Sequence, residues 1–369
     1  MFLGAALLLF AEYQAMSFVH FGTFLLLAGA LVLSGGEPGP AEPSSAAAPQ
    51  LRPLLDDLEG KPIETRAGWQ KQRAQLKREW QKVVGEFPKS KVPLNTVSLG
   101  REVLPGFTRK HLQYQVEKGL FVDGYLLTPE NPVGQLPAVV VFHPTTPLQA
   151  KGVAGLSPDY PEEKWQGVQL VQRGYMVWCP RNYINTDGAD WSRNATKAIA
   201  AHPGWTGMAR MTWDAIRAAD FLESLPNVDR KRIGCLGHSL GAKQVLYAMA
   251  FDERYRAGVF SEGGIGLKSS NWDAVWYLGP KVRATDFARE HHELLAMIAP
   301  RAFLLIGGGS ADGEGSREFV RAVEPVYRLL GREGKIQFMN HQQGHAYPPE
   351  ARRAAEEFLE RELRTDSGN

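Results

Sequence analysis

One short motif in the sequence has the residue types and spacing of a nucleophile on a tight turn. Residues 237–241 read GHSLG, which places Ser239 two residues after one glycine and two residues before another. An apolar run at 233–236 precedes the motif, and a run typical of a helix follows it at 240–251. A sharp strand-to-helix turn needs small residues at those positions and lifts the serine hydroxyl above the sheet. The pattern predicts Ser239 as a nucleophile; the alternative is a glycine-rich turn with a solvated serine.

A serine nucleophile needs an adjacent base, and a histidine near the end of the chain is in the right place. The base is expected on the loop after the last strand, and His345 lies there, beyond a predicted strand at 336–339. Gly344 gives this loop the freedom to turn the imidazole towards the serine. His341 is the competing histidine, and we interpret it as structural or as a support of the site. The two histidines could also form a metal pair, but the loop setting argues against a helical pair of ligands.

Two carboxylates qualify as the acid that orients the base. Asp312 follows a predicted strand at 302–306, and Glu262 follows the preceding predicted strand at 257–260. The chain order of serine, acid and histidine favours Asp312, and Glu262 is the alternative, because either strand end can reach the base. Each could instead be an exposed loop carboxylate. Both could also matter, one as the acid and the other as a contact to the substrate or to the triad.

An acyl-transfer site also needs two donors aimed at the oxyanion. The backbone N–H of Leu240, directly after the serine, is expected to be one of them. The other should come from the loop after the predicted strand at 138–142, where Thr145 is the first choice and Thr146 the second. Pro144 has no N–H and is excluded.

Alternating strands and helices must position these residues. Apolar runs predict strands at 138–142, 175–179, 233–236, 257–260, 302–306 and 336–339. Helical patterns lie between and after them at 162–173, 208–225, 240–251, 290–297, 316–330 and 349–363. Repeated β-α-β units imply the α/β class, with a mostly parallel twisted sheet and helices on both faces. Ligands in such sheets bind beyond the carboxyl ends of the strands.

The rest of the chain divides into shorter segments. Residues 1–35 contain two apolar runs and no Lys or Arg, and they predict a signal peptide or an N-terminal membrane anchor, with Met16 as an alternative start. Residues 36–50 are rich in Pro, Ala and Ser and predict a flexible linker. We expect residues 51–96 to form a helical cover with an amphipathic helix at 66–87. The catalytic domain is expected at 97–364, beginning with two antiparallel strands at 97–129, and residues 365–369 are expected to form a disordered tail.

Composition excludes some classes of partner. The chain has 369 residues, of which 44% are hydrophobic, and a formal net charge of only +2. This charge gives no electrostatic footprint for nucleic acid. Cys179 and Cys235 both lie in apolar runs, which favours small buried side chains over a disulfide. The leader favours a secreted or periplasmic location, and a membrane tether is the alternative.

Several stretches of the chain resemble one branch of a large hydrolase family. They are residues 237–264 (GHSLGAKQVLYAMAFDERYRAGVFSEGG), 271–277 (NWDAVWY), 291–308 (HHELLAMIAPRAFLLIGG), 310–313 (SADG), 325–331 (PVYRLLG) and 344–345 (GH). Over roughly 97–363 the chain is similar to the α/β-hydrolases of the dienelactone-hydrolase-like and acetyl-xylan-esterase-like branch, and to glucuronoyl esterases. The resemblance implies an α/β-hydrolase fold and an esterase for carbohydrate-linked or small carboxylic esters.

The similarity to glucuronoyl esterases extends to single residues. Those enzymes have a lysine four residues after the serine, which matches Ser239 and Lys243, and a glutamate after the next strand, which matches Glu262. Their loop HxLxAxxAPR resembles residues 292–301. They also carry an arginine directly after the nucleophile, where this chain has Leu240. Dienelactone hydrolases proper use a cysteine nucleophile, and this chain has a serine.

Three residues near the predicted site are candidates for substrate binding. Trp272 and Trp276 follow the strand at 257–260, together with Tyr277, and could stack on sugar rings or simply pack a lid. Lys243 lies one turn into the helix after Ser239 and could touch the substrate or anchor neighbouring loops.

The residues together predict a serine carboxylic-ester hydrolase that works through an acyl-enzyme and needs no metal or organic cofactor. Its expected partner is a small-molecule or carbohydrate ester. One alternative is a serine peptidase of the prolyl-oligopeptidase type, although no propeller-length region precedes residue 97. The other is a non-catalytic binding protein with a hydrolase fold, which should lack a member of the triad.

Overall fold

A computed structural model describes residues 51–57, 59–185 and 190–364 of the chain. The predicted leader at 1–35, the linker at 36–50 and the tail at 365–369 lie outside these residues. In the described part of the chain, no helix has both the length and the apolar character needed to cross a bilayer.

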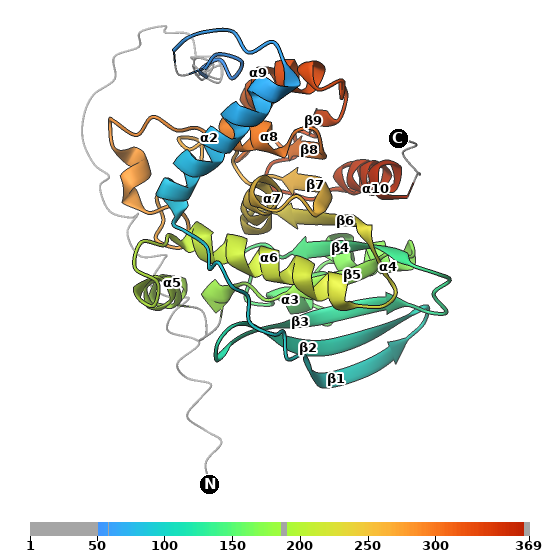
Figure 1. The fold of residues 1–369 in the computed structure, drawn as a ribbon. Helices are drawn as coiled ribbons and strands as arrows, with labels where there is room; N and C mark the ends of the chain where they lie inside the picture. The colour runs from blue at the N-terminus through green and yellow to red at the C-terminus, as the bar shows by residue number, and fades with distance from the viewer. Residues whose placement is uncertain (1–50, 58, 186–189, 365–369) are drawn as a thin grey trace, which may run out of the picture. The chain divides into compact units, whose positions relative to one another are not determined.

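Within the residues that the structure describes, nine strands form one sheet in the order β1-β2-β3-β5-β4-β6-β7-β8-β9 (Figure 1). Their bounds are β1 Val97–Leu104, β2 Phe107–Glu117, β3 Leu120–Pro129, β4 Leu136–Phe142, β5 Met176–Pro180, β6 Val228–His238, β7 Tyr255–Ser261, β8 Ala302–Gly307 and β9 Ile336–Asn340. Strands β1 to β3 are antiparallel, and β3 joins β5 antiparallel. The pairs from β5 through β4 to β9 are all parallel. The predicted mostly parallel sheet is therefore confirmed.

Helices follow or separate the parallel strands. The α-helices are α2 Arg66–Val84, α3 Ala150–Val153, α4 Gln166–Gln172, α5 Trp191–Ala200, α6 Gly207–Ser224, α7 Leu240–Phe251, α8 His292–Ile298, α9 Arg317–Leu329 and α10 Pro349–Leu363. Short 3-10 turns are η1 Glu162–Lys164, η2 Tyr183–Asn185, η3 Pro280–Arg283 and η4 Glu314–Ser316.

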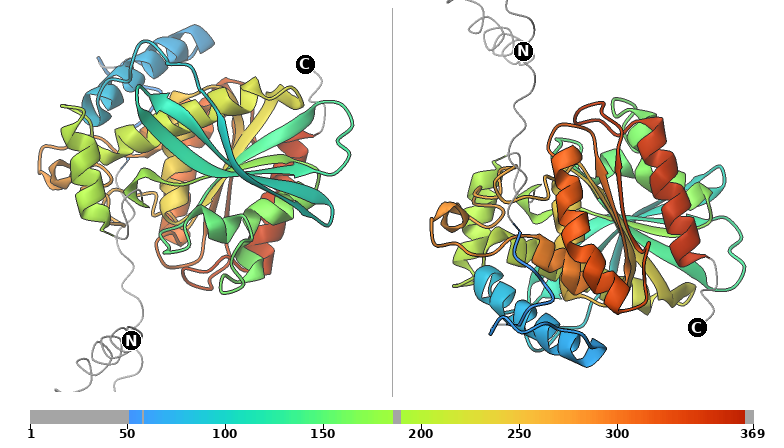
Figure 2. Two further views of the ribbon diagram at one scale, coloured as in Figure 1. Left: turned by 90° about the horizontal axis from the view of Figure 1, so that it is seen from below. Right: turned by 90° about the horizontal axis from the view of Figure 1, so that it is seen from above.

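Helices cover the sheet on both of its faces (Figure 2). Side chains of α2, α6, α7, α8 and α9 share one apolar cluster with Val140 and Phe260, whereas α3, α4 and α10 share the other with Val139 and Val259. Adjacent residues of β4 and of β7 thus point to opposite cores. This double burial explains why the strands are continuous apolar runs and not alternating ones.

The N-terminal cover contains one long helix. Thr65 caps α2 by accepting the N–H of Gly68 at 3.0 Å, and the helix buries Trp69, Leu76 and Trp80 on one side. The predicted helix at 66–87 ends earlier, at Val84, because the next residue is Gly85 with a φ of +110°. A side chain at Gly85 would lie 2.6 Å from the carbonyl oxygen of Gly204, so the chain turns away there.

Three predictions of secondary structure need correction. Residues 97–129 form three antiparallel strands and not two, because Gly106 and Gly119 both adopt positive φ and close tight turns. The helix predicted at 162–173 is divided at Trp165 into η1 and α4. Helix α5 was not predicted, although Asp190, which accepts the N–H of Arg193 at 3.0 Å, is a recognisable N-cap.

The cysteine prediction agrees with the structure. Cys179 lies in β5 and Cys235 in β6, and both are buried and free. Each thiol packs in one of the two apolar clusters, as a small hydrophobic side chain does.

Candidate active site

Ser239 stands on a strained turn between β6 and α7. Its backbone has φ +57° and ψ −119°, a combination that residues other than glycine rarely adopt. Its N–H donates to the carbonyl of Ser261 at 2.8 Å. A Cβ on Gly237 would lie 2.2 Å from the carbonyl carbon of Gly241, and a Cβ on Gly241 would lie 2.0 Å from the carbonyl oxygen of Phe142. Both glycines are therefore required by close backbone contacts.

The loop after β9 brings His345 to this serine. The Nε2 atom of His345 lies 2.9 Å from the Ser239 hydroxyl, and its Nδ1 atom lies 3.1 Å from a carboxylate oxygen of Glu262. With the ring proton on Nδ1, the ring donates to Glu262 and accepts the proton of the serine hydroxyl. Residues 239, 262 and 345, far apart in sequence, thus form one continuous chain of contacts.

Glu262 directly follows β7 and is completely buried. Its carboxylate accepts the backbone N–H groups of Gly308, of Ala311 at 2.9 Å and of Asp312 at 3.2 Å, all on the loop after β8. Burial raises the pKa of this carboxyl, but the bonds from His345 and from these three N–H groups outweigh burial and leave the pKa below its ordinary value. The structure therefore holds Glu262 as an ionised acceptor beside His345.

Asp312, the favoured acid in the sequence analysis, is not placed beside His345. It is also completely buried, and its carboxylate accepts the N–H of Gly264 at 2.6 Å, the N–H of Ile265 at 2.8 Å and the hydroxyl of Ser316 at 2.8 Å. Chain order could not separate the two carboxylates, because β7 and β8 are neighbours and both end at the same edge of the sheet. The structure brings the alternative acid, Glu262, to the histidine.

Of the two residues predicted for the oxyanion hole, Leu240 directly follows Ser239 in the chain, and Thr145 lines the same cleft as Ser239. Leu240 is the first residue of α7, where the N–H has no preceding helical turn to bind. Thr145 lies on the loop after β4 and lines the same cleft as Ser239. Thr146, the second choice, does not line this cleft; its hydroxyl accepts the N–H of Leu148 at 3.3 Å.

A cleft of about 450 Å³ opens above the serine. Hydroxyl, amide and charged side chains dominate its walls. Its lining residues are Thr145, Ser239, Lys243, Glu262, Gly263, Ser269, Ser270, Asn271, Tyr277, Ser310, Ala311 and His345. Ser269, Ser270, Asn271 and Ser310 line the cleft, but the sequence analysis did not name them as site residues. Asn271 and Ser310 begin the quoted stretches NWDAVWY and SADG, and the two serines directly precede Asn271.

Of the three predicted substrate-binding residues, only Lys243 lines the cleft. Its ammonium group donates to the carbonyl of Gly263 and to the hydroxyl of Ser270 at 2.7 Å, and it lies 4.0 Å from the ring centre of Trp272. Burial lowers the pKa of Lys243 to about 7, although the negative charge of nearby Asp312 raises this pKa in part. The lysine therefore both lines the cleft and anchors a loop.

The two tryptophans do not form a platform in the cleft. Trp272 is 0% exposed, and its indole N–H donates to the carbonyl of Gly264 at 2.7 Å. Trp276 packs edge-on against Trp191, with 6.3 Å between ring centres, and does not line the cleft. Since the face of Trp272 is covered, it cannot stack on a sugar, and its role is to hold a loop. Tyr277 is the aromatic residue of this stretch that reaches the cleft.

A second histidine supports the first. His238 packs against His345 with 4.9 Å between ring centres, and its Nδ1 atom lies 3.1 Å from the hydroxyl of Ser261. Burial, and then the charge of His345, lowers the pKa of His238 to about 3, so this ring stays neutral. The sequence analysis missed His238, although it directly precedes the serine in the motif. His341, the competing base, instead accepts the N–H of Gln343 at 3.1 Å within its own loop.

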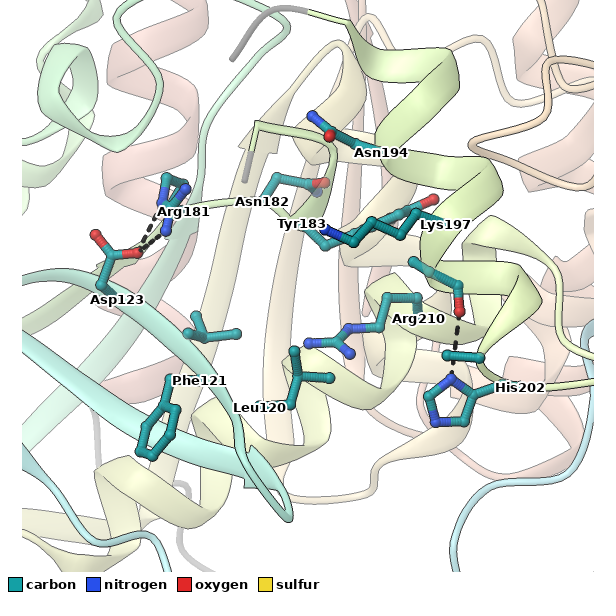
Figure 3. Close-up of a pocket in the computed structure, with 13 residues that line it drawn as sticks. Leu120, Phe121, Asp123, Arg181, Asn182, Tyr183, Asn194, Lys197, His202 and Arg210 are labelled. Carbon is teal, nitrogen blue, oxygen red and sulfur yellow. Dashed lines mark hydrogen bonds and ion pairs between the residues drawn. The ribbon is translucent and has the colours of Figure 1, made fainter. Parts of the chain in front are cut away.

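A separate pocket of about 210 Å³ lies between the start of β3 and α5 (Figure 3). Leu120, Phe121, Ala198 and Ala201 supply apolar walls, and Asn182 is at its inner side. None of its lining residues also lines the Ser239 cleft. Within the described residues, no group of three or more His, Cys, Asp or Glu side chains is arranged to hold a metal ion.

The sheet, the serine turn and the order of serine and histidine define the α/β-hydrolase fold. The model of the dienelactone hydrolase family matches residues 122–269, which confirms the predicted resemblance over this part of the chain.

Known proteins of similar sequence cover different shares of the chain. The protein YtaP of Bacillus subtilis (strain 168) is 22% identical over 302 residues, which cover 79% of this chain and 100% of that protein. The 4-O-methyl-glucuronoyl methylesterase 1 of Sodiomyces alcalophilus is 30% identical over 128 residues, which cover 27% of this chain and 25% of that protein. This chain thus spans only a quarter of the methylesterase.

Solved structures confirm the fold over most of the chain. A glucuronoyl esterase from Solibacter usitatus superposes with a TM-score of 0.70 at 19% sequence identity and covers 85% of this chain and 98% of its own. The names of the matched proteins support the predicted class of enzyme, a carboxylic ester hydrolase.

Proposed function

We propose that this protein is a serine carboxylic-ester hydrolase in which Ser239 is the nucleophile, His345 the base and Glu262 the acid of the triad. The observation that carries the proposal is the pair of contacts at His345, 2.9 Å to the serine hydroxyl and 3.1 Å to the Glu262 carboxylate. Both distances suit proton transfer and orientation without any movement of the chain.

The reaction proceeds in two acyl-transfer steps. His345 takes the proton of Ser239 as the serine oxygen attacks the ester carbonyl, and the backbone N–H groups of Leu240 and Thr145 stabilise the oxyanion. His345 then gives the proton to the leaving alcohol, and an acyl-enzyme remains. Water repeats the sequence and frees the acid. Buried Glu262 holds the imidazole in the correct tautomer and stabilises its charged form.

The walls of the cleft favour esters with polar groups. Serine, asparagine and lysine side chains line it, which suits the hydroxyl groups of a carbohydrate better than a long fatty chain. The relatives named as glucuronoyl esterases and methylesterase point in the same direction. Leu240 stands where those enzymes have an arginine, and it is 1% exposed, so it supplies neither a charge nor a surface to the cleft. Carbohydrate-linked or small polar esters are therefore the proposed substrates.

Covalent labelling tests the mechanism directly. A fluorophosphonate probe should label the wild-type protein at Ser239, and Ser239→Ala should abolish labelling. Ser269→Ala, which removes a different hydroxyl of the cleft, is the matched control and should still be labelled. Absence of labelling in the folded wild-type protein would favour a non-catalytic binding protein.

A substrate panel tests the class of ester. We expect hydrolysis of p-nitrophenyl acetate and of at least one of two carbohydrate esters, acetylated xylan and a methyl ester of glucuronic acid. No cleavage of peptide anilides is expected. Cleavage of a prolyl peptide anilide at a rate above that of p-nitrophenyl acetate would instead assign a serine peptidase.

We also propose export through the apolar leader at 1–35. Mass spectrometry of the N-terminus of the mature protein, made with its full leader in a bacterial host, tests this proposal. A new N-terminus after the second apolar run indicates a signal peptide. An intact leader in the membrane fraction indicates a tether, and an intact leader in the cytoplasm contradicts export.

A further inference from the structure

The loops after β7 and β8 bind each other through two buried carboxylates. Glu262, on the first loop, accepts N–H groups from Gly308, Ala311 and Asp312 of the second. Asp312, on the second loop, accepts N–H groups from Gly264 and Ile265 of the first. The arrangement is reciprocal. Glu262 binds the backbone N–H of Asp312 itself, and Asp312 binds the backbone two and three residues after Glu262. We call these two side chains and their bonds the carboxylate latch.

From this geometry we infer that Asp312 is a positioning residue, which acts on the reaction only through Glu262. The inference rests on the proposed function, in which Glu262 orients His345. Asp312 does not contact His345; it would contribute to catalysis by holding the backbone that carries Glu262 in place.

The backbone after Glu262 is held on both sides. Asp312 binds the N–H groups of Gly264 and Ile265. The carbonyl groups of the same segment are held by three other buried side chains. These donors are Lys243 to Gly263, Trp272 to Gly264 and the Nδ1 atom of His291 to Ile265 at 2.7 Å. The N–H groups of Gly264 and Ile265 each bind one oxygen of the Asp312 carboxylate. Within the described residues, no other side chain accepts a hydrogen bond from these two N–H groups.

The conformation of Glu262 explains why such support is needed. Its φ is +51°, in the left-handed region that a glutamate rarely adopts. A strained residue of this kind persists only where its surroundings hold it. Its own N–H donates to the carbonyl of Ile306 at 2.9 Å, which holds the backbone at Glu262. The latch holds the backbone of Gly264 and Ile265, the two residues after Gly263. Loss of the latch would let Glu262 relax and withdraw its carboxylate from His345.

The charges of the latch interact with each other and with the neighbouring lysine. Glu262 and Asp312 are both completely buried, and burial, followed by the charge of Glu262, raises the pKa of Asp312 against its hydrogen bonds. The charge of Asp312 in turn supports the ammonium form of Lys243. Three N–H or O–H donors point at the Asp312 carboxylate, and none of its bonds requires it to donate. Asp312→Asn therefore replaces an acceptor with an NH₂ group that faces a backbone N–H.

A double-mutant cycle tests the inference. Glu262→Gln, Asp312→Asn and the double variant are compared for kcat and KM on p-nitrophenyl acetate. Asp312→Asn alone should lower kcat about 10- to 100-fold with little change of KM, as loss of a supporting hydrogen bond does at other sites. In the Glu262→Gln background the same substitution should cost less than about twofold, because the residue through which it acts is already disabled.

Two further variants keep the test decisive. Ser316→Ala removes one bond to Asp312 but keeps both bonds to the segment at 264–265, and it should leave kcat within about twofold of wild type. Asp312→Glu keeps the charge and displaces the carboxylate by one methylene. It should lower kcat in the wild-type background only, and it replaces Asp312→Asn in the cycle if the asparagine variant does not fold.

Each pattern of results has a single meaning. An equal loss from Asp312→Asn in both backgrounds overturns the inference, because Asp312 then acts elsewhere. A larger loss in the Glu262→Gln background also overturns it and makes Asp312 a substitute acid. The pH profile of kcat/KM is the readout that a purely structural role would not move; Asp312→Asn should shift it in the direction of Glu262→Gln. If Ser239→Ala retains activity, the proposed function fails before the cycle is interpreted.

Discussion

The Ser239 cleft and the pocket beside α5 differ in how their polar groups are used. In the pocket, charged groups bind one another or a close neighbour. Arg181 pairs with Asp123 at 2.5 Å (Figure 3), and Arg210 pairs with Asp214, which lies outside the lining, at 3.0 Å. In the cleft, the charge of Glu262 is directed through His345 to a hydroxyl that faces the open space. The charged groups of the pocket thus neutralise one another, whereas those of the cleft act on a hydroxyl in open space.

Position in the sheet explains the difference. The cleft is built from loops that follow β4, β6, β7, β8 and β9, where five carboxyl ends meet. The pocket is built mainly from the first residues of the antiparallel strand β3, the segment after β5, and helices α5 and α6. Convergence of several strand ends allows residues far apart in sequence to reach one point. We therefore expect substitutions in the cleft to change the reaction, and matched substitutions in the pocket to leave it unchanged.

The largest effect is expected from a methyl group at the serine turn. Gly241→Ala would place Cβ 2.0 Å from the carbonyl oxygen of Phe142, and a backbone atom cannot move aside without opening the sheet. We expect loss of measurable esterase activity and a strong fall of the unfolding temperature. Gly315→Ala is the control, since nothing lies within 4 Å of its Cβ. A Gly241→Ala variant with wild-type kcat would contradict the tight turn.

The next largest effect is expected from removing the charge of a carboxylate in the cleft, compared with one in the pocket. Glu262→Gln keeps the shape of the side chain but removes its charge, and we expect kcat to fall about 10³- to 10⁴-fold, as at other triads that lose their acid. Asp123→Asn, which removes a carboxylate from the pocket, should change kcat less than about threefold. Steady-state kinetics on one activated ester measures both. Comparable losses in the two variants would remove the distinction between cleft and pocket.

A smaller effect concerns stability and pH at Lys243. Burial lowers the pKa of this ammonium group in the folded protein to about 7, from an ordinary 10.5. Between these two values the unfolded chain binds more protons than the folded one, so this group makes the folded state more stable as pH rises. The rise is at most about 1.4 kcal/mol per pH unit.

Thermal unfolding at pH 7 and pH 9 measures this effect. From pH 7 to pH 9, the unfolding temperature of wild type should rise relative to that of Lys243→Met. Lys91→Met, which removes an exposed partner of Asp220, should show no such change between the two pH values. A difference that is the same at both pH values would show that Lys243 is not desolvated.

Local patterns in the sequence predicted much of this arrangement, because they report local physics. The glycines around Ser239 reflect backbone contacts that admit no side chain, and the apolar runs reflect strands buried on both faces. Position in the chain was also enough to place His345 beyond the last strand. These features follow from the chain near each residue, so a single sequence contains them.

The choice between Asp312 and Glu262 depends on tertiary structure that no local pattern encodes. Both follow apolar strands that end at the same edge of the sheet, and both are completely buried. Only the left-handed φ of Glu262 and the crossed hydrogen bonds of the two loops decide which carboxylate meets the histidine. The burial of Trp272 has the same origin, because packing of a loop against Lys243 and His291 covers its ring.

The smallest effect is expected from filling the pocket beside α5. Ala198→Phe adds a ring to a wall of a cavity of about 210 Å³, which has room for it. One contact links the pocket to the loop that carries Thr145: the backbone N–H of Asn182 donates to Nε2 of His143 at 3.0 Å, two residues before Thr145. Since His143 is 1% exposed and held in place, we expect kcat/KM to change less than about twofold. A tenfold loss with unchanged unfolding temperature would show that the pocket controls the loop that carries Thr145, and the two regions would then have to be treated as one site.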